Sequence, residues 1–181
     1  MLVDNCRAGV KPAPTIKIFL TSKLTIMTKQ QLMQEAIRLS IENIKNGGGP
    51  FGAVIAKNGE IVATGVNLVT VNNDPTAHAE VTAIRAAAQK LKTFDLSGYE
   101  IFTSCEPCPM CLSAIYWAHL DKIYYGNTKV DAANIDFDDS FIYDELDLKP
   151  SDRKIKMEQL MPEEAISAFE AWTEKEDKIR Y

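Results

Sequence analysis

Two short motifs constrain this chain more than any other feature. The first is His78-Ala79-Glu80, and the second is Cys108-Pro109-Met110-Cys111, preceded by Pro107. A helix that begins near Pro109 puts both sulfurs on one side of its first turn, because residues three apart are neighbours on a helix. Prolines favour such a start, since a proline in the first turn gives up only an N–H that has no helical partner. The free N–H groups there favour the thiolate form that binds metals.

The two motifs together supply the ligands of a catalytic zinc site. Zinc prefers four ligands, and two thiolates, one imidazole and a water form the open set found in enzymes. We therefore expect His78, Cys108 and Cys111 to hold one Zn²⁺ per subunit. Glu80 lies two residues beyond His78, where a carboxylate can take a proton from the water and pass it to a substrate. The pattern His-x-Glu followed by Pro-Cys-x-x-Cys is the signature of the zinc-dependent base deaminases.

Each half of this pattern also has a simpler interpretation. A CxxC alone can be half of a structural zinc knuckle or a redox pair, and a single histidine is often a hydrogen-bonded core residue. Cys105 extends the cysteine run to C-x2-C-x2-C, which resembles part of an iron–sulfur motif. No fourth cysteine follows, and Cys105 ends a predicted strand, so we expect Cys105 to be structural.

Composition and charge indicate the general class of the protein. The chain has 181 residues, 46% of them hydrophobic and 25% charged, which suits one globular domain with a real core. A net charge of −5 argues against nucleic acid as a partner, and no stretch approaches the length of a transmembrane helix. Three of the four cysteines lie close together, which favours metal chemistry in a reducing compartment. We expect a cytoplasmic protein that does not bind membranes.

Hydrophobic periodicity predicts alternating helices and strands. The predicted helices cover 28–46, 78–91 and the segment after the cysteines, and the predicted strands cover 53–56, 61–63, 99–103 and 123–125, with a hairpin turn at Asn58-Gly59. Val81, Ile84, Ala88 and Leu91 form the predicted buried face of the second helix. This order predicts an α/β fold with helices on both faces of one sheet. Both metal-bearing helices then begin at the same sheet edge.

The chain is predicted to have three parts. Residues 1–26 form a flexible N-terminal extension, because a T-x-x-Q capping box marks a helix start at Thr28. Residues 27–155 form the main domain. Residues 156–181 form a helical tail in which Ile166, Phe169 and Trp172 recur at helical spacing. This tail needs an apolar surface to pack against.

With these residues in hand, the chain resembles the cytidine deaminase-like superfamily, and within it the bacterial guanine deaminases. The resemblance runs from about Met27 to Tyr181 and rests on the segments 73–85, 103–112, 114–117 and 137–143. The first two segments are common to zinc deaminases, and the other two are typical of guanine enzymes. The resemblance implies a three-layer α/β/α sandwich with a mixed central sheet. It also implies the hydrolysis of guanine to xanthine and ammonia, in purine catabolism or salvage.

The resemblance further implies roles for individual residues. Glu80 carries protons, while Asn67 contacts the base, the amide of Ala79 lies beside it and Phe51 packs on its face. One member of the Asp138-Asp139 pair, with Asp139 favoured, faces the polar edge of the base, where guanine offers donors at N1 and the exocyclic amine. The C-terminal Tyr181 lies over the pocket, and the tail is exchanged between the two subunits of a homodimer. Without the resemblance, Asn67 is a turn residue, Phe51 a core residue and Asp139 a cap.

Three other functions fit parts of the pattern. A tRNA adenosine deaminase shares the metal motif but needs a cationic surface, which the acidic composition does not favour. A deaminase of guanosine or cytosine uses the same chemistry, although closure of the pocket by the tail would tend to exclude a ribose. A non-catalytic zinc-binding module has no need of Glu80.

Overall fold

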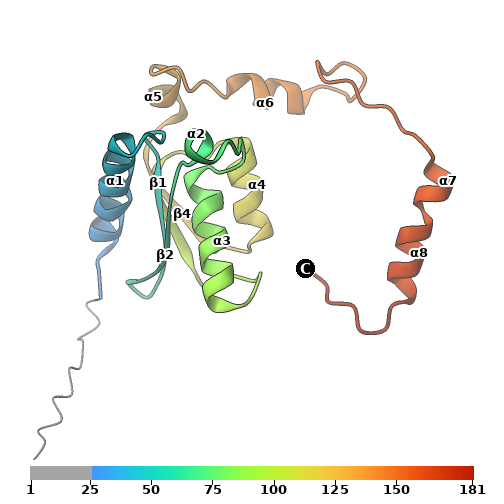
Figure 1. Cartoon of the computed structure of the whole chain (residues 1–181), viewed down its shortest axis with the longest axis horizontal. Coiled ribbons are helices and arrows are strands. Elements are labelled where there is room, and N and C mark those ends of the chain that lie inside the picture. Colours follow the sequence, from blue (N-terminus) through green and yellow to red (C-terminus); the bar gives the residue numbers. More distant parts are fainter. Residues whose placement is uncertain (1–25) are drawn as a thin grey trace, which may run out of the picture.

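A mixed four-stranded sheet lies at the centre of the computed structural model, which describes residues 26–181 (Figure 1). The strand order is β2-β1-β3-β4, with the bounds β1 Gly52–Lys57, β2 Glu60–Val66, β3 Glu100–Cys105 and β4 Lys122–Asn127. Strand β1 is antiparallel to β2 and β3, whereas β3 and β4 are parallel. The β1–β2 turn has positive φ at Asn58 and Gly59, as an Asn-Gly hairpin requires.

Helices cover both faces of this sheet. Helix α1 (Lys29–Lys45) packs on one face, and α3 (Ala79–Leu91) and α4 (Pro109–Trp117) lie on the other, as Figure 1 shows. The predicted three-layer α/β/α sandwich is therefore confirmed. The remaining helices are short: α2 Val69–Asn72, α5 Lys129–Ala133, α6 Ser140–Asp147, α7 Pro162–Ala165 and α8 Ser167–Glu174.

Helix α1 begins at the predicted capping box. The Gln31 amide donates to the Thr28 hydroxyl at 3.3 Å, and the Thr28 amide donates to the Gln31 side chain at 2.8 Å. The buried face of α1 consists of Leu32, Ala36, Ser40 and Asn43, whereas the isoleucines at 37, 41 and 44 are exposed. Two polar residues thus lie on the sheet side of this helix, and one of them, Asn43, reaches the functional site.

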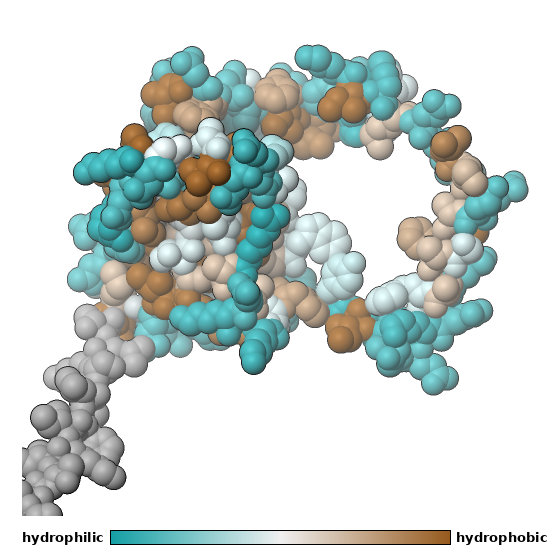
Figure 2. Space-filling view, viewed as in Figure 1, coloured by the Kyte–Doolittle hydropathy of each residue, from teal (hydrophilic) through white to brown (hydrophobic). Residues whose placement is uncertain are grey.

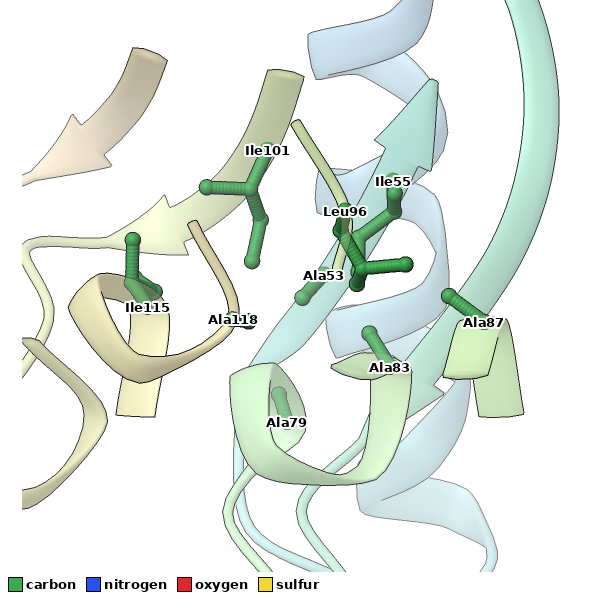
Figure 3. Packing of buried hydrophobic residues seen from close by; sticks show 9 residues of the cluster. All are labelled: Ala53, Ile55, Ala79, Ala83, Ala87, Leu96, Ile101, Ile115 and Ala118. Carbon is green, nitrogen blue, oxygen red and sulfur yellow. The ribbon is translucent and has the colours of Figure 1, made fainter. Parts of the chain in front are cut away.

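Helix α3 packs on the sheet through alanine. Ala79, Ala83 and Ala87 are fully buried and lie against side chains of the sheet that include Ala53, Ile55 and Ile101 (Figure 3). The predicted buried face was wrong in part, because Val81 is buried but Ile84, Ala88 and Leu91 are only half-buried. The physical reason is a close approach at Gly65 of β2, where a Cβ would clash with the Ala79 carbonyl and the Ala83 amide.

From α6 onward the chain extends away from the sandwich. Helices α6, α7 and α8 form an arc, and Figure 2 shows hydrophobic side chains along it, with open space between the arc and the body. Ile166, Phe169 and Trp172 of the tail are all exposed, so the apolar residues predicted to need a surface do not find one within residues 26–181. In the same range, no helix is both long and apolar enough to cross a membrane.

Candidate zinc centre and active site

The N-termini of α3 and α4 bring the three expected metal ligands together. His78 is the N-cap of α3 and Cys108 the N-cap of α4, where Pro109 takes the first helical position as predicted. The Nδ1 atom of His78 lies 3.5 Å from the sulfurs of Cys108 and Cys111 alike. Ligands on one tetrahedral zinc ion, with bonds of about 2.3 Å to sulfur and 2.0 Å to nitrogen, are separated by roughly this distance. The donor set and its spacing therefore fit zinc.

Local hydrogen bonds favour a thiolate at this site. The Cys111 amide donates to the Cys108 sulfur at 3.5 Å. Hydrogen bonding from Cys111, and then from His78, lowers the pKa of Cys108 to about 4, and the same contact with Cys108 raises the pKa of His78. The neighbouring Cys108 raises the pKa of Cys111. A bound dication would stabilise both cysteines as thiolates.

Glu80 stands beside the metal ligands without belonging to them. It lies in the first turn of α3, is 6% exposed, and accepts a hydrogen bond of 3.0 Å from the Thr103 hydroxyl. Burial raises the pKa of Glu80. A carboxylate whose pKa is raised toward neutrality is suited to accept and return a proton during a reaction.

A cavity of about 300 Å³ opens in front of this group. Its lining combines the zinc residues with apolar walls and a few charges: Gly49, Phe51, Asn67, Val69, Thr70, His78, Glu80, Cys105, Glu106, Cys108, Lys129, Ala132, Phe137, Asp138, Asp139, Phe141 and Ile142. The volume is at the lower end of the range for small-molecule sites, which suits a single flat ring system. The cavity joins residues from segments that are far apart in the sequence.

Asn67 and Phe51, both predicted to contact the base, line one wall. Asn67 is buried, and its Oδ1 accepts from the Val69 amide at 3.2 Å, which leaves Nδ2 as the group that can donate to a ligand. The Asn43 side chain from α1 donates to the carbonyls of Gly49 and Asn67, at 2.8 and 2.7 Å. Asn43 thereby links the Gly49 and Asn67 segments, which both line the cavity.

The acidic pair contributes two carboxylates with different surroundings. Asp138 accepts from the Ser140 amide at 2.9 Å, and this hydrogen bond lowers its pKa. Asp139 is the N-cap residue of α6, yet its side chain makes no capping hydrogen bond. Burial raises the pKa of Asp139. Both carboxylates line the cavity, and that of Asp138 is already engaged by the Ser140 amide through one oxygen.

The other two residues predicted to contact the base, Ala79 and Tyr181, lie in different parts of the molecule. Ala79 is the first residue of α3, between His78 and Glu80, where backbone N–H groups have no partner within the helix. Tyr181 does not line this cavity within its own chain. Its ring lies 6.1 Å from the rings of Phe94 and Trp117, on another part of the body.

Cys105 lies outside the metal cluster. It ends β3 as predicted, is buried, and its sulfur faces the Thr128 carbonyl at 3.6 Å. Burial raises the pKa of Cys105 to about 11. The described metal cluster therefore contains two cysteines and one histidine, unlike an iron–sulfur site.

Sequence patterns alone did not identify several residues of the site. Phe137, Phe141 and Ile142 form an apolar wall from the segment around α6, and Phe137 contacts Phe51 edge to face at 5.0 Å. The available signal was the unusual mixture of aromatic and acidic residues between 131 and 147. Thr103 and Asn43 gave no signal, because single polar residues in a strand or helix have no characteristic spacing.

Comparison with known proteins agrees with this geometry. Residues 26–127 match the family model described as the cytidine and deoxycytidylate deaminase zinc-binding region. The guanine deaminase of Bacillus subtilis is 48% identical over 156 residues, which are 86% of this chain and 100% of that protein. Its crystal structure superposes with a TM-score of 0.83 and covers 86% of this chain and 99% of that one.

Two further relatives match shorter segments. A tRNA-specific adenosine deaminase of Aquifex aeolicus is 37% identical over 100 residues, covering 55% of this chain and 66% of that protein. The structure of the protein NE0047 in complex with 2,6-diaminopurine is 35% identical, with a TM-score of 0.58, covering 60% of this chain and 61% of that one. The chain belongs to the cytidine and deoxycytidylate deaminase zinc-binding family, and its similarity to a guanine deaminase extends over the whole length of that relative.

Proposed function

We propose that this protein hydrolyses guanine to xanthine and ammonia, as a zinc-dependent hydrolase of purine catabolism or salvage. The observation that carries the proposal is the pairing of two carboxylates across a cavity of about 300 Å³. Glu80 lies beside the metal ligands, and Asp139 lines the same cavity without capping its own helix. One carboxylate is placed for proton transfer and the other for recognition of a base with several N–H donors.

The residues of this chain divide the reaction between them. His78, Cys108 and Cys111 hold the zinc ion, which when bound acts as a Lewis acid that lowers the pKa of water to about 7. The Glu80 carboxylate takes a proton from the water as its oxygen bonds to C2, and delivers this proton to N3, the unprotonated ring nitrogen next to C2. Glu80 then takes the remaining proton of the new C2 hydroxyl and passes it to the exocyclic amine, so that the C2–N bond breaks and ammonia leaves. Burial of Glu80 favours this cycle, because its raised pKa reduces the cost of the protonated state.

Recognition of guanine falls to the cavity walls. The Asp139 carboxylate accepts from the polar edge of the base, and Nδ2 of Asn67 donates to an acceptor on the ring. Phe51 packs on the ring face, and the backbone amide of Ala79, free at the start of α3, lies alongside. Adenine and cytosine do not present the same donors to a carboxylate, which is the physical basis for selectivity.

The exposed tail supports a homodimer with exchanged C-termini. The apolar residues of 156–181 are exposed in one chain, and Tyr181 lies away from its own cavity. A tail that packs on a second copy would bury these residues and would bring Tyr181 over the partner's cavity. The proposed organisation is therefore a deaminase domain at 27–155 and a swapped tail. The clustered thiols support a location in the cytoplasm, where cysteines remain reduced.

A tRNA adenosine deaminase is the second candidate, because the tRNA-specific adenosine deaminase of Aquifex aeolicus is 37% identical over 100 residues. That similarity covers 55% of this chain, whereas the guanine deaminase match covers 86% and includes much of the segment after β4. The net charge of −5 also opposes binding to a phosphate backbone.

Ammonia release from guanine, guanosine, adenine, cytosine and tRNA, each at the same zinc-loaded enzyme concentration, tests the proposal. We expect release from guanine, with much slower turnover of the other compounds. Turnover of tRNA adenosine without turnover of guanine would overturn the proposal. Release from guanosine at the rate of guanine would show that the cavity admits a ribose and would contradict the choice of a free base.

A further inference from the structure

The centre of β3 carries a polar side chain where the packing calls for an apolar one. Alternate residues of a strand share a face, so Thr103 lies on the same side as Ile101, which belongs to the apolar cluster beneath α3 and α4. Thr103 is 1% exposed. Burying a hydroxyl without a partner is unfavourable, so the position of Thr103 needs a compensating contact.

The compensating contact is the carboxylate of Glu80. The Thr103 hydroxyl donates to Glu80 Oε1 at 3.0 Å, and within residues 26–181 the structure gives it no other partner. Neither side chain can turn to solvent, because both are almost completely buried. The Glu80 carboxylate therefore satisfies the Thr103 hydroxyl, and the same carboxylate also contacts the Cys111 side chain.

The backbone makes Thr103 a rigid support for this contact. It pairs with Ala53 of β1 on one side and with Tyr125 of β4 on the other, so both ladders fix the strand at this residue. A threonine side chain is also stiff at χ1, because it is branched at Cβ. By contrast, the terminal torsion of a glutamate is broad, so burial alone does not orient the carboxylate plane.

We propose that Thr103 is the positioning residue of the proton carrier. By binding Oε1 it fixes the plane of the Glu80 carboxylate, so that the second oxygen, Oε2, serves the reacting water and base. Thr103 itself does not touch the substrate. This inference rests on the proposed role of Glu80 in deamination, and it adds a residue outside the zinc motif to the catalytic arrangement.

Thr103→Val tests the proposal, since valine keeps the shape and removes only the donor. We expect kcat for guanine to fall by about 10- to 100-fold, because a displaced catalytic group can cost that much. KM should stay within about twofold, and zinc content should remain one per subunit by elemental analysis. Thr103→Ser keeps the hydroxyl and should recover most of kcat.

Ser40→Ala is the matched control, because it also removes a buried hydroxyl. That hydroxyl donates within α1, to the Ile37 carbonyl at 2.8 Å. The substitution should lower the thermal midpoint of unfolding without lowering kcat. The proposal is overturned if Thr103→Val keeps the wild-type kcat, if Thr103→Ser is as slow as Thr103→Val, or if the loss of activity follows a loss of zinc. Failure of the proposed function is distinct, since the wild-type enzyme would then release no ammonia from guanine.

Discussion

Glu80 is the residue on which the proposed chemistry depends most directly. Glu80→Gln keeps the size of the side chain and its contact with Thr103 but cannot carry a proton. We expect zinc to stay bound and turnover to fall by about 10²–10⁴-fold, the usual range for loss of a general acid–base group. Ammonia release and zinc content, measured on the same sample, check this result.

The control for this substitution is Glu60→Gln, because Glu60 is exposed on β2 and lies outside the cavity. This variant should have wild-type turnover. Turnover by Glu80→Gln at the same rate as the control would exclude Glu80 as the proton carrier.

Cys105 provides a pH-dependent test of burial. Its pKa rises from 9.0 to about 11 in the folded protein. Because the thiolate is the reactive form, iodoacetamide at pH 9 should modify Cys105 much more slowly in the folded, zinc-saturated protein than in the unfolded chain. The raised pKa contributes stability that is complete below pH 9 and is lost as pH approaches 11. Peptide mass spectrometry measures the rates, and equal rates would contradict the assigned burial.

Residues with a characteristic local spacing were the ones that the sequence could predict. The two cysteines are three positions apart at a proline-marked helix start, so one turn of backbone determines how close their sulfurs lie. The contact between Thr103 and Glu80 joins β3 to α3 and depends on how closely the helix approaches the sheet. No local pattern records such a distance, so Thr103 was missed although the residues around it were recognised.

At the scale of elements, the position of α3 depends on a glycine in the neighbouring strand. Gly65 of β2 faces the backbone of Ala79 and Ala83, and there is no space for a Cβ. We expect Gly65→Ala to lower the free energy of unfolding by about 1–3 kcal/mol through overpacking. Because His78 is the N-cap of α3 and Glu80 lies in its first turn, a shift of α3 should also weaken zinc binding. Denaturant unfolding and competition with a chelator measure the two effects.

Gly47→Ala is the control for this prediction, since Gly47 has open space around it and a φ of +83°. This substitution should lower the free energy of unfolding by about 1 kcal/mol through backbone strain alone. Its zinc affinity should be that of the wild type. If both variants lose stability equally and both retain zinc affinity, then the close approach at Gly65 does not position the zinc site.

The close approach of Gly65 to the backbone of α3 explains why the buried face of α3 could not be predicted from its sequence. Periodicity selects the largest apolar residues, Ile84 and Leu91, but the glycine brings the helix so close that only alanine fits beneath it. The helix itself, the hairpin turn at Asn58-Gly59 and the capping box at Thr28 depend on local chemistry, and all three were predicted correctly.

At the scale of the whole molecule, several large apolar side chains within residues 26–181 are exposed in a single chain. Phe169 is 71% exposed and Tyr181 is 75% exposed, and the exposed Trp117 of α4 lies next to Tyr181. The aromatic and acidic segment around α6 completes the cavity, whereas the tail beyond it does not reach that cavity within its own chain. In the proposed tail exchange, these exposed apolar residues would pack against the partner subunit.

Mixed dimers test the exchange directly. Glu80→Gln and Tyr181→Ala should each be slow as homodimers. When the two variants are co-expressed with different tags and isolated as heterodimers, the subunit that retains Glu80 receives the intact Tyr181 from its partner. One of two sites is then complete, and turnover should recover to about half of the wild-type value. If each tail instead serves its own subunit, neither site is complete and the heterodimer stays slow, which would refute the exchange.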